Sequence, residues 1–232
     1  MSASDNAQSR LLILLKFGLR QHLQQLRTEG LLHMNPLRYF SKLESDLVRT
    51  DRFEGTSTII QPQDIGEFTL TSILGTVTAQ PSDFVGPVLI SRNRTASCNV
   101  YCMFAVTRPV DGTLVDRRNL KFGDSFVLIL NTQEFLNRVS SAMKTAGLSC
   151  KGGLVEYYDC EKHSGETGPF RKPSTFQYQS EFRLIVYPGS SDPVRLNVGS
   201  LVDITSEVLP LSDVNKHLDF STESARKAGL KW

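Results

Sequence analysis

Apolar residues recur at two different periods along the chain, and these periods predict a mixture of strands and helices. A run of strand length, Leu11–Phe17, is followed by leucines at helical spacing. Gly30 is placed to end the helix in the left-handed conformation, and Leu31–Met34 has the pattern of a second strand. The opening is therefore predicted to be strand, helix, strand. The helical leucines are Leu19, Leu23 and Leu26.

The middle of the chain, from Thr56 to Val127, is rich in Thr, Ile and Val with Gly and Pro interruptions. Short segments of this kind are typical of an antiparallel or mixed sheet. The most strand-like of them is Asn99–Thr107. Its Tyr101 and Met103 lie on the face opposite that of Val100, Cys102, Phe104 and Val106. The remaining expected strands are Thr58–Ile60, Phe68–Val77, Val88–Ser91 and Ser125–Leu130.

A second helix is predicted after these strands. Thr132 is a suitable N-cap, apolar residues follow at helical spacing, and Gly147 closes the segment. We interpret Met143 on this helix as a core residue rather than a ligand. Later, Asp159–Lys172 is expected to be a polar loop and Ser221–Leu230 a charged helix-like segment. Further strands are expected at Leu154–Tyr158, Val194–Val198 and Val202–Val208.

One late segment, Phe176–Tyr187, combines a strand pattern with an unusual polar row. On a continuous strand its alternate residues Gln177, Gln179, Glu181 and Arg183 project from the same face. Two interpretations remain open. The segment is either a half-exposed antiparallel strand with solvated polar groups, or a catalytic strand whose lone carboxylate is Glu181.

Composition narrows the class of protein. The chain has 232 residues, of which 40% are apolar and 22% charged, so it can bury a sizeable core. We expect an α+β protein with a flexible segment at residues 1–9 and a single domain over residues 10–232. No apolar run approaches the length that crosses a bilayer, and no signal peptide is predicted, so we expect a soluble, cytoplasmic protein without a membrane partner.

Charge and cysteine content give weaker indications. A net charge of +2 does not by itself indicate a nucleic-acid-binding protein. The cysteines lack Cys-x-x-Cys spacing, so free thiols are favoured over a zinc site on Cys98 and Cys102, and no metal site is predicted. Basic clusters form either a local basic rim or ordinary solvated loop charges. They are Arg92 with Arg94, Arg117 with Arg118 and Lys121, and Arg171 with Lys172.

Several motifs, taken in order, resemble a known group. LLKFGLRQHLQQLRTEGLLHMNPLRYF resembles the opening of a large group of bacterial proteins of uncertain function, often found near phage-resistance loci. Asp51-Arg52-Phe53-Glu54-Gly55 stands where that group has a small acidic cluster. Three later segments, NVYCMF, FGDSFVLI and KPSTFQYQSEFRLIV, resemble its later strands, so the likeness touches most of residues 11–187.

The architecture of that group is similar to the ADP-ribosyltransferase fold, including toxins that modify DNA. The resemblance implies mixed, largely antiparallel sheets with a few flanking helices, and NAD as substrate. Gln179-Ser180-Glu181 matches the Gln-x-Glu of the catalytic strand, which makes Glu181 the catalytic carboxylate and Gln179 the residue that orients the acceptor. Arg183 is expected to pair with Glu181 and hold it ionised.

The same resemblance implies contacts with NAD. Lys16 stands where relatives have Arg or His and would meet the pyrophosphate, although the chain has no Ser-Thr-Ser triplet. Either Tyr101 or Phe176 would stack on the nicotinamide ring. Phe17 and Arg52 complete the expected cofactor-binding set.

The expected function is transfer of ADP-ribose from NAD to a macromolecule by a toxin or phage-defence effector. A nucleic-acid base, in RNA or DNA, is favoured over a protein side chain, and an antitoxin or regulatory partner is expected. One alternative is a catalytically silent module of the same fold that binds a nucleotide or a partner. The other is a metal-dependent nuclease that uses Asp51, Glu54 and Glu181.

Overall fold

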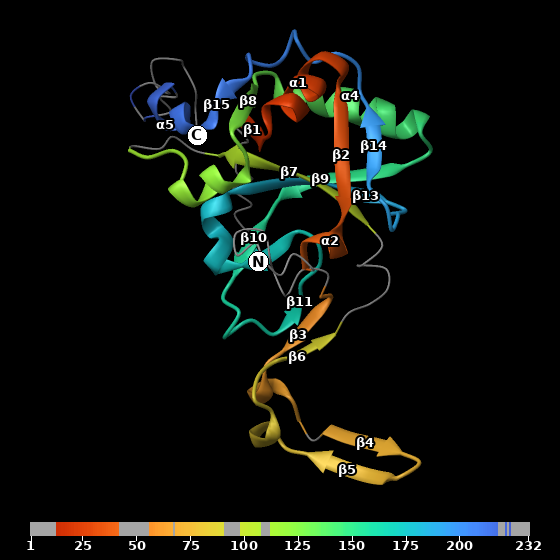
Figure 1. Cartoon of the computed structure of the whole chain (residues 1–232). Helices are drawn as coiled ribbons and strands as arrows, with labels where there is room; N and C mark the ends of the chain where they lie inside the picture. The colour runs from red at the N-terminus through yellow and green to blue at the C-terminus, as the bar shows by residue number, and fades with distance from the viewer. Residues whose placement is uncertain are drawn as a thin grey trace, which may run out of the picture.

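A large, mainly antiparallel sheet forms the centre of the molecule (Figure 1). The computed structural model describes residues 13–41, 56–66, 68–90, 98–107, 112–217, 221 and 223. Mixed helices and antiparallel strands within these ranges agree with the expected α+β class. The strands of the large sheet are β1 (Ile13–Gly18), β2 (Leu31–Pro36), β7 (Asn99–Val106), β8 (Ser125–Ile129), β9 (Ser149–Leu154), β13 (Glu181–Tyr187), β14 (Val194–Asn197) and β15 (Leu209–Pro210).

Strand β7 lies at the centre of this sheet because it pairs antiparallel with three others, β1, β2 and β13. Beyond them, β8 and β15 continue the sheet from β1, β9 pairs with β13, and β14 pairs with β2. The register places Phe104 between Leu15 on β1 and Glu181 on β13. Strands β1 and β13 are thus joined through β7 alone.

The predicted strand–helix–strand opening is confirmed. Helix α1 (Arg20–Glu29) joins β1 to β2 and buries Leu23 and Leu26. Gly30 ends it in the left-handed conformation, with φ of 69°. Leu19, expected on the apolar face, instead precedes the helix as its N-cap and is 47% exposed, so the buried face begins one turn later.

The second predicted helix is also present, as α4 (Thr132–Thr145). Its N-cap is Asn131 rather than Thr132, because the Asn131 side chain accepts a hydrogen bond from the Glu134 backbone N–H. Met143 is buried in the same apolar cluster as the buried leucines of α1, so its interpretation as a core residue is confirmed. Both helices therefore cover one face of the central sheet (Figure 1).

Alternation along β7 divides the core as the sequence predicted. Tyr101 and Met103 face the cluster beneath α1 and α4. Phe104 and Val106 face a second cluster, which includes residues of the short helices η5 (Leu211–Asp213) and α5 (Val214–His217). Val100 belongs to a third cluster, with residues of α2 (Leu37–Ser41) and β13.

Three predicted strands were wrong in extent. Phe68–Val77 is part of a hairpin of β4 (Phe68–Ser72) and β5 (Gly75–Ala79). The turn was not predicted because two apolar residues occupy it. Val202–Val208 contains turns and one isolated bridge instead of a strand, although Val208 is buried. Leu154–Tyr158 is divided between the end of β9 and β10 (Glu156–Tyr158). Strand β10 pairs with β12 (Arg171–Pro173), which begins within the segment 159–172 that was expected to be a loop.

A smaller part of the molecule extends away from the large sheet (Figure 1). It contains the three-stranded sheet of β3 (Thr58–Ile60), β6 (Val88–Ile90) and β11 (Gly165–Glu166), the one-turn helices η1 (Pro62–Asp64) and η2 (Pro81–Asp83), and the β4–β5 hairpin. Across the described residues, no helix is both long and apolar enough to span a bilayer. The cluster at residues 51–55, Arg92, Arg94 and most of Ser221–Leu230 lie outside the described residues.

Candidate functional site

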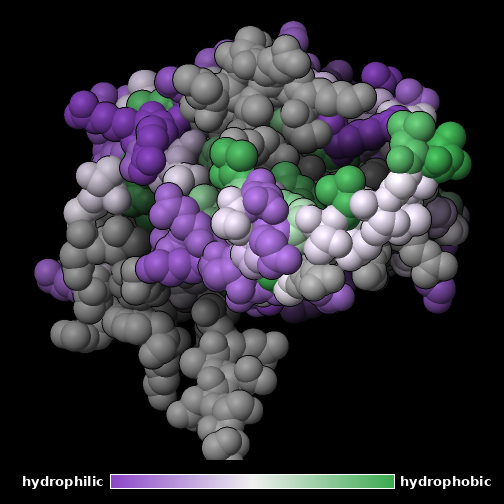
Figure 2. All heavy atoms as spheres, turned by 90° about the horizontal axis from the view of Figure 1, so that it is seen from below, coloured by the Kyte–Doolittle hydropathy of each residue, from purple (hydrophilic) through white to green (hydrophobic). Residues whose placement is uncertain are grey.

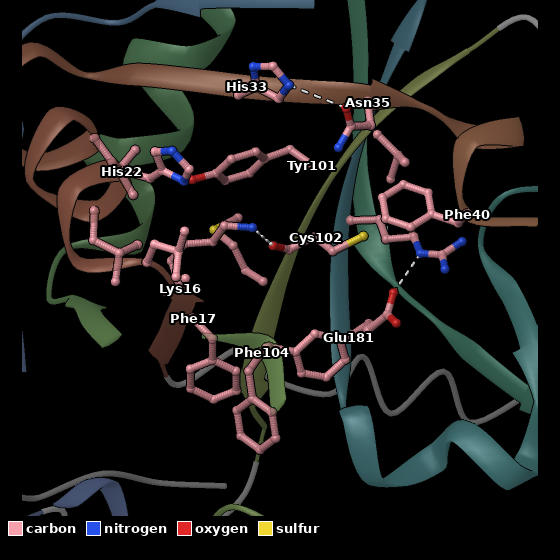
Figure 3. Close-up of a pocket in the computed structure, with 18 of the residues that line it drawn as sticks. Lys16, Phe17, His22, His33, Asn35, Phe40, Tyr101, Cys102, Phe104 and Glu181 are labelled. Carbon is pink, nitrogen blue, oxygen red and sulfur yellow. Dashed lines mark hydrogen bonds and ion pairs between the residues drawn. The ribbon is translucent and has the colours of Figure 1, made fainter. Parts of the chain in front are cut away.

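A pocket of about 710 Å³ opens between the first strand–helix–strand unit and β13. Figure 3 shows Glu181, Phe104 and Phe17 toward one end of it and His22, His33 and Asn35 toward the other, with Tyr101 and Lys16 between. A volume of this size is within the usual range for small-molecule sites. The structure therefore brings Glu181, Gln179, Lys16, Phe17 and Tyr101, all singled out from the sequence, into one cavity.

Glu181 is the carboxylate at the centre of this arrangement. It is the first residue of β13 and follows Ser180, whose φ of 40° turns the chain into the strand. Its side chain is buried but lines the pocket. Oε1 accepts a 2.8 Å hydrogen bond from the Lys172 ammonium, and Oε2 accepts one of 2.7 Å from Arg183 Nε.

These two cations decide the charge of Glu181. Burial raises the pKa of the carboxyl, but the charges and hydrogen bonds of Arg183 and Lys172 outweigh it and hold the pKa well below its usual value. Glu181 is therefore ionised at neutral pH. The expected pairing with Arg183, one pleat along the same strand face, is confirmed.

Gln179 reaches this group by a route that the sequence did not predict. The expected continuous strand over Phe176–Tyr187 is wrong, because Ser174–Gln179 form a 3-10 helix, η4, and β13 starts only at Glu181. Gln177 is exposed on η4, away from the buried group. Gln179 Oε1 instead accepts a 2.6 Å hydrogen bond from Lys172 Nζ, which joins the amide to the carboxylate.

Lys172 is thus a partner of Glu181 that the sequence analysis missed. It was assigned to a possible basic rim, yet it is only 4% exposed and donates to both Gln179 and Glu181. Its Nζ also lies 4.7 Å from the centre of the Phe176 ring. Phe176 is not among the residues lining the pocket, and its ring contacts Lys172 instead. No local spacing could have revealed Lys172, since the fold of η4 brings it to Glu181.

The first strand contributes an anchored cation and an aromatic ring. Lys16 Nζ donates a 2.6 Å hydrogen bond to the Cys102 carbonyl oxygen and lies 4.2 Å from the centre of the Tyr101 ring (Figure 3). The Phe17 ring lies 5.6 Å from that of Phe104, centre to centre. Lys16 and Tyr101 therefore form one wall of the pocket. Arg52, the remaining expected contact, lies outside the described residues.

The far end of the pocket holds polar residues that the sequence analysis did not select. His33 on β2 is paired in register with Arg195 on β14, and both side chains are exposed and line the pocket. His33 Nε2 lies 3.3 Å from Asn35 Oδ1 (Figure 3). A signal existed for this pair, because His33 and Asn35 alternate with the buried residues Leu32 and Met34 along β2.

The described side chains of the pocket carry an excess of positive charge. Their single carboxylate, Glu181, is accompanied by four lysine and arginine side chains, which favours an anionic ligand. The cations are Lys16, Lys172, Arg183 and Arg195.

None of the four cysteines, all of which lie in the described ranges, forms a disulfide. Burial, with a further contribution from the Glu181 charge, raises the pKa of the Cys102 thiol to about 12, so this pocket residue is protonated at neutral pH. Within the ranges that the structure describes, no three His, Cys, Asp or Glu side chains are grouped to hold a metal ion.

No protein-family model matches the chain, and neither curated proteins nor solved structures yield a match.

Proposed function

We propose that this protein is an NAD-dependent ADP-ribosyltransferase that transfers ADP-ribose to a macromolecule. The observation that carries the proposal is an ionised carboxylate, Glu181, buried at the end of a positively charged pocket with an aromatic ring and a lysine along its wall. The pyrophosphate of NAD supplies the anionic charge that such a pocket favours.

In this proposal Glu181 binds the hydroxyl groups of the nicotinamide ribose. A carboxylate has about four acceptor positions. Lys172 and Arg183 each take one of them, one on either oxygen, so an acceptor position remains on each. Cleavage of the nicotinamide–ribose bond develops positive charge on the sugar, and a hydroxyl held by a carboxylate stabilises that charge better than a hydroxyl in water does.

The two flanking cations define how Glu181 acts. They offset its negative charge, so direct electrostatic attraction to the oxocarbenium-like sugar is weakened relative to that of an isolated carboxylate. They also keep it deprotonated and fixed in position. Glu181 is therefore assigned the role of an oriented hydrogen-bond acceptor, and Lys172 and Arg183 that of positioning residues.

A nucleic-acid base is proposed as the acceptor ahead of a protein side chain. Basic residues of η3 (Arg117–Phe122) lie next to η4, because Asn119 Nδ2 donates a 2.8 Å hydrogen bond to the Tyr178 carbonyl oxygen. Arg118 is stacked 3.8 Å from the centre of the Tyr178 ring. Because Arg118 is also paired with Asp116, the charge for phosphate is assigned to the exposed Arg117 and Lys121 of η3.

The acceptor is tested by expressing the chain in cells and searching RNA, DNA and protein for ADP-ribose by mass spectrometry. The matched control is the double variant Lys172→Met/Glu181→Gln, which removes one positive and one negative charge and keeps the charge of the buried group unchanged. ADP-ribose on nucleic acid with the wild-type chain alone supports the proposal. Modification of protein alone would exclude the proposed acceptor, and equal modification by both chains would exclude the role of Glu181.

A second candidate, a silent module that binds a nucleotide or a partner, is favoured by one specific observation. Both oxygens of Glu181 are already paired with cations, an arrangement that also occurs in purely structural sites. Calorimetric titration with NAD separates the two candidates. Binding without release of nicotinamide over a long incubation supports the silent module, whereas binding with release supports the transferase.

A further inference from the structure

The β4–β5 hairpin is an exposed part of the described chain. Figure 1 shows it at the lower end of the molecule, beyond the small sheet of β3, β6 and β11. Figure 2, which views the molecule from below, shows residues of intermediate hydropathy at this end, followed by hydrophobic residues. Ile73 and Leu74 at its turn are fully or almost fully exposed, and Val77 on β5 is 67% exposed. Apolar surface of this kind marks interaction sites.

The hairpin also has open edges. Within the described residues, β4 and β5 pair only with each other. An isolated two-stranded hairpin is marginally stable in water, and exposed edges are normally protected by charged residues or proline. Residues 68–79 contain neither a charged residue nor a proline. The segment is therefore suited to pair with a further strand.

The chemistry of this edge does not oppose pairing with a second copy of the hairpin. On one face of the hairpin, threonine hydroxyls hydrogen-bond across the strands, Thr69 with Thr78 and Thr71 with Thr76. The acidic residues of the flanking one-turn helices, Asp64 and Asp83, lie at the base of the hairpin. Antiparallel pairing of two hairpins sets each acidic base beside the uncharged turn of the other copy, so like charges do not meet.

We propose that two copies of this chain associate through β5, strand against strand about a two-fold axis at Val77. Thr76 then lies opposite Thr78 of the second copy, and the two hairpins form one four-stranded sheet. This inference rests on the hairpin alone and is independent of the function proposed for the pocket.

The hairpin geometry identifies which backbone groups would make this contact. Its two-residue turn places Ser72 opposite Gly75, the pair that closes the hairpin with both of its hydrogen bonds. Alternation then directs the backbone N–H and C=O of Val77 toward β4 and those of Thr76 and Thr78 toward the free edge. A proline at position 78 removes an outward N–H without removing a hydrogen bond of the hairpin.

The proposal is tested by sedimentation velocity of the full chain from about 1 to about 100 μM, the range of weak to moderate association. We expect the wild-type mass to rise to that of a dimer. Thr78→Pro should weaken association at least about tenfold, whereas Thr78→Val, which keeps the N–H, should change it less than about twofold. A wild-type chain that stays monomeric throughout, or a dimer equally stable with Thr78→Pro, would overturn the proposal.

A register-specific measurement keeps the test decisive if proline distorts the hairpin. At the two-fold axis the two copies of residue 77 form a non-hydrogen-bonded pair, whose Cα atoms are close enough for a disulfide. Val77→Cys should therefore cross-link to itself under mild oxidation, identified as a peptide joined through position 77. Leu130→Cys, at an exposed apolar position of similar accessibility, should not. Absence of the 77–77 cross-link would contradict the proposed pairing.

Discussion

Lys172 donates a 2.8 Å hydrogen bond to Glu181 from a different strand, and the same ammonium holds Gln179 at 2.6 Å. One buried cation therefore joins an amide and a carboxylate that come from separate elements. With Arg183 on the other side of Glu181, two cations flank one carboxylate among the described residues of this group, and all three side chains are buried. Its stability depends on that balance, because an unpaired buried charge is costly.

The first prediction concerns this balance. Glu181→Gln removes the carboxylate that accepts hydrogen bonds from the buried cations Lys172 and Arg183, and it should lower the free energy of unfolding by about 3–5 kcal/mol. Adding Lys172→Met restores the charge balance, so the double variant should be more stable than the sum of the two single changes predicts, by about 0.5–3 kcal/mol. Urea unfolding of the four proteins measures this coupling, and additivity would contradict the account.

The second prediction is a pH dependence. The pKa of Glu181 lies below its ordinary value of 4.5 in the folded protein. Its contribution to stability is therefore complete above that value and declines as the pH falls below it toward the folded-state pKa. The difference in unfolding free energy between wild type and Lys172→Met/Glu181→Gln should be constant from about pH 7 to about pH 5 and shrink below about pH 4. A loss centred near neutral pH would contradict the assignment.

The third prediction concerns Cys102. Its pKa of about 12 compares with an ordinary 9.0, so the reactive thiolate is about a thousandfold rarer at mildly alkaline pH. Although Cys102 lines the pocket, its alkylation by iodoacetamide should be at least about tenfold slower in the folded protein than in urea. Peptide mass spectrometry over time gives both rates, and equal rates would show that the Cys102 thiol is neither buried nor influenced by Glu181.

The fourth prediction separates backbone strain from close packing at two glycines. Gly30 and Gly147 both have φ of 69°, so alanine at either position should cost about 1–2 kcal/mol. A Cβ at Gly30 would lie only 1.9 Å from the Gly199 carbonyl oxygen, whereas one at Gly147 would meet nothing within 4 Å. Gly30→Ala should therefore be more destabilising than Gly147→Ala by more than about 1 kcal/mol. Thermal unfolding compares them, and equal losses would place the backbone of Gly199 elsewhere.

Periodicity predicted the elements whose two faces differ strongly. The opening strand–helix–strand unit and the two faces of β7 are of this kind. Leu23 and Leu26 share a face only at helical spacing, and Tyr101 points away from its neighbours on β7 only if that segment is a strand. The hairpin at Ile73 and Leu74 was missed because a turn formed by apolar residues leaves no polar signal.

The site was predictable only in part. Glu181 and Arg183 could be paired from their spacing along one strand, and the structure has them 2.7 Å apart. The start of that strand could not be predicted, because apolar and polar residues also alternate along Phe176–Gln179. In addition, Ser180 separates the helix from the strand in the left-handed conformation, and serine does not normally mark such a turn. Lys172 was assigned to the surface because charged residues usually lie there, and only the tertiary fold supplies its two acceptors.

The most direct test of the proposed chemistry is to incubate the purified protein with NAD, in the presence and absence of RNA or DNA. Chromatography then measures the nicotinamide that is released. The account predicts release by wild type, stimulated by the nucleic-acid acceptor, and a loss of at least about a hundredfold in Lys172→Met/Glu181→Gln. Thermal unfolding confirms that this variant is folded under the assay conditions. Undiminished release by the folded double variant, or no release by wild type with any acceptor, would contradict the central claim.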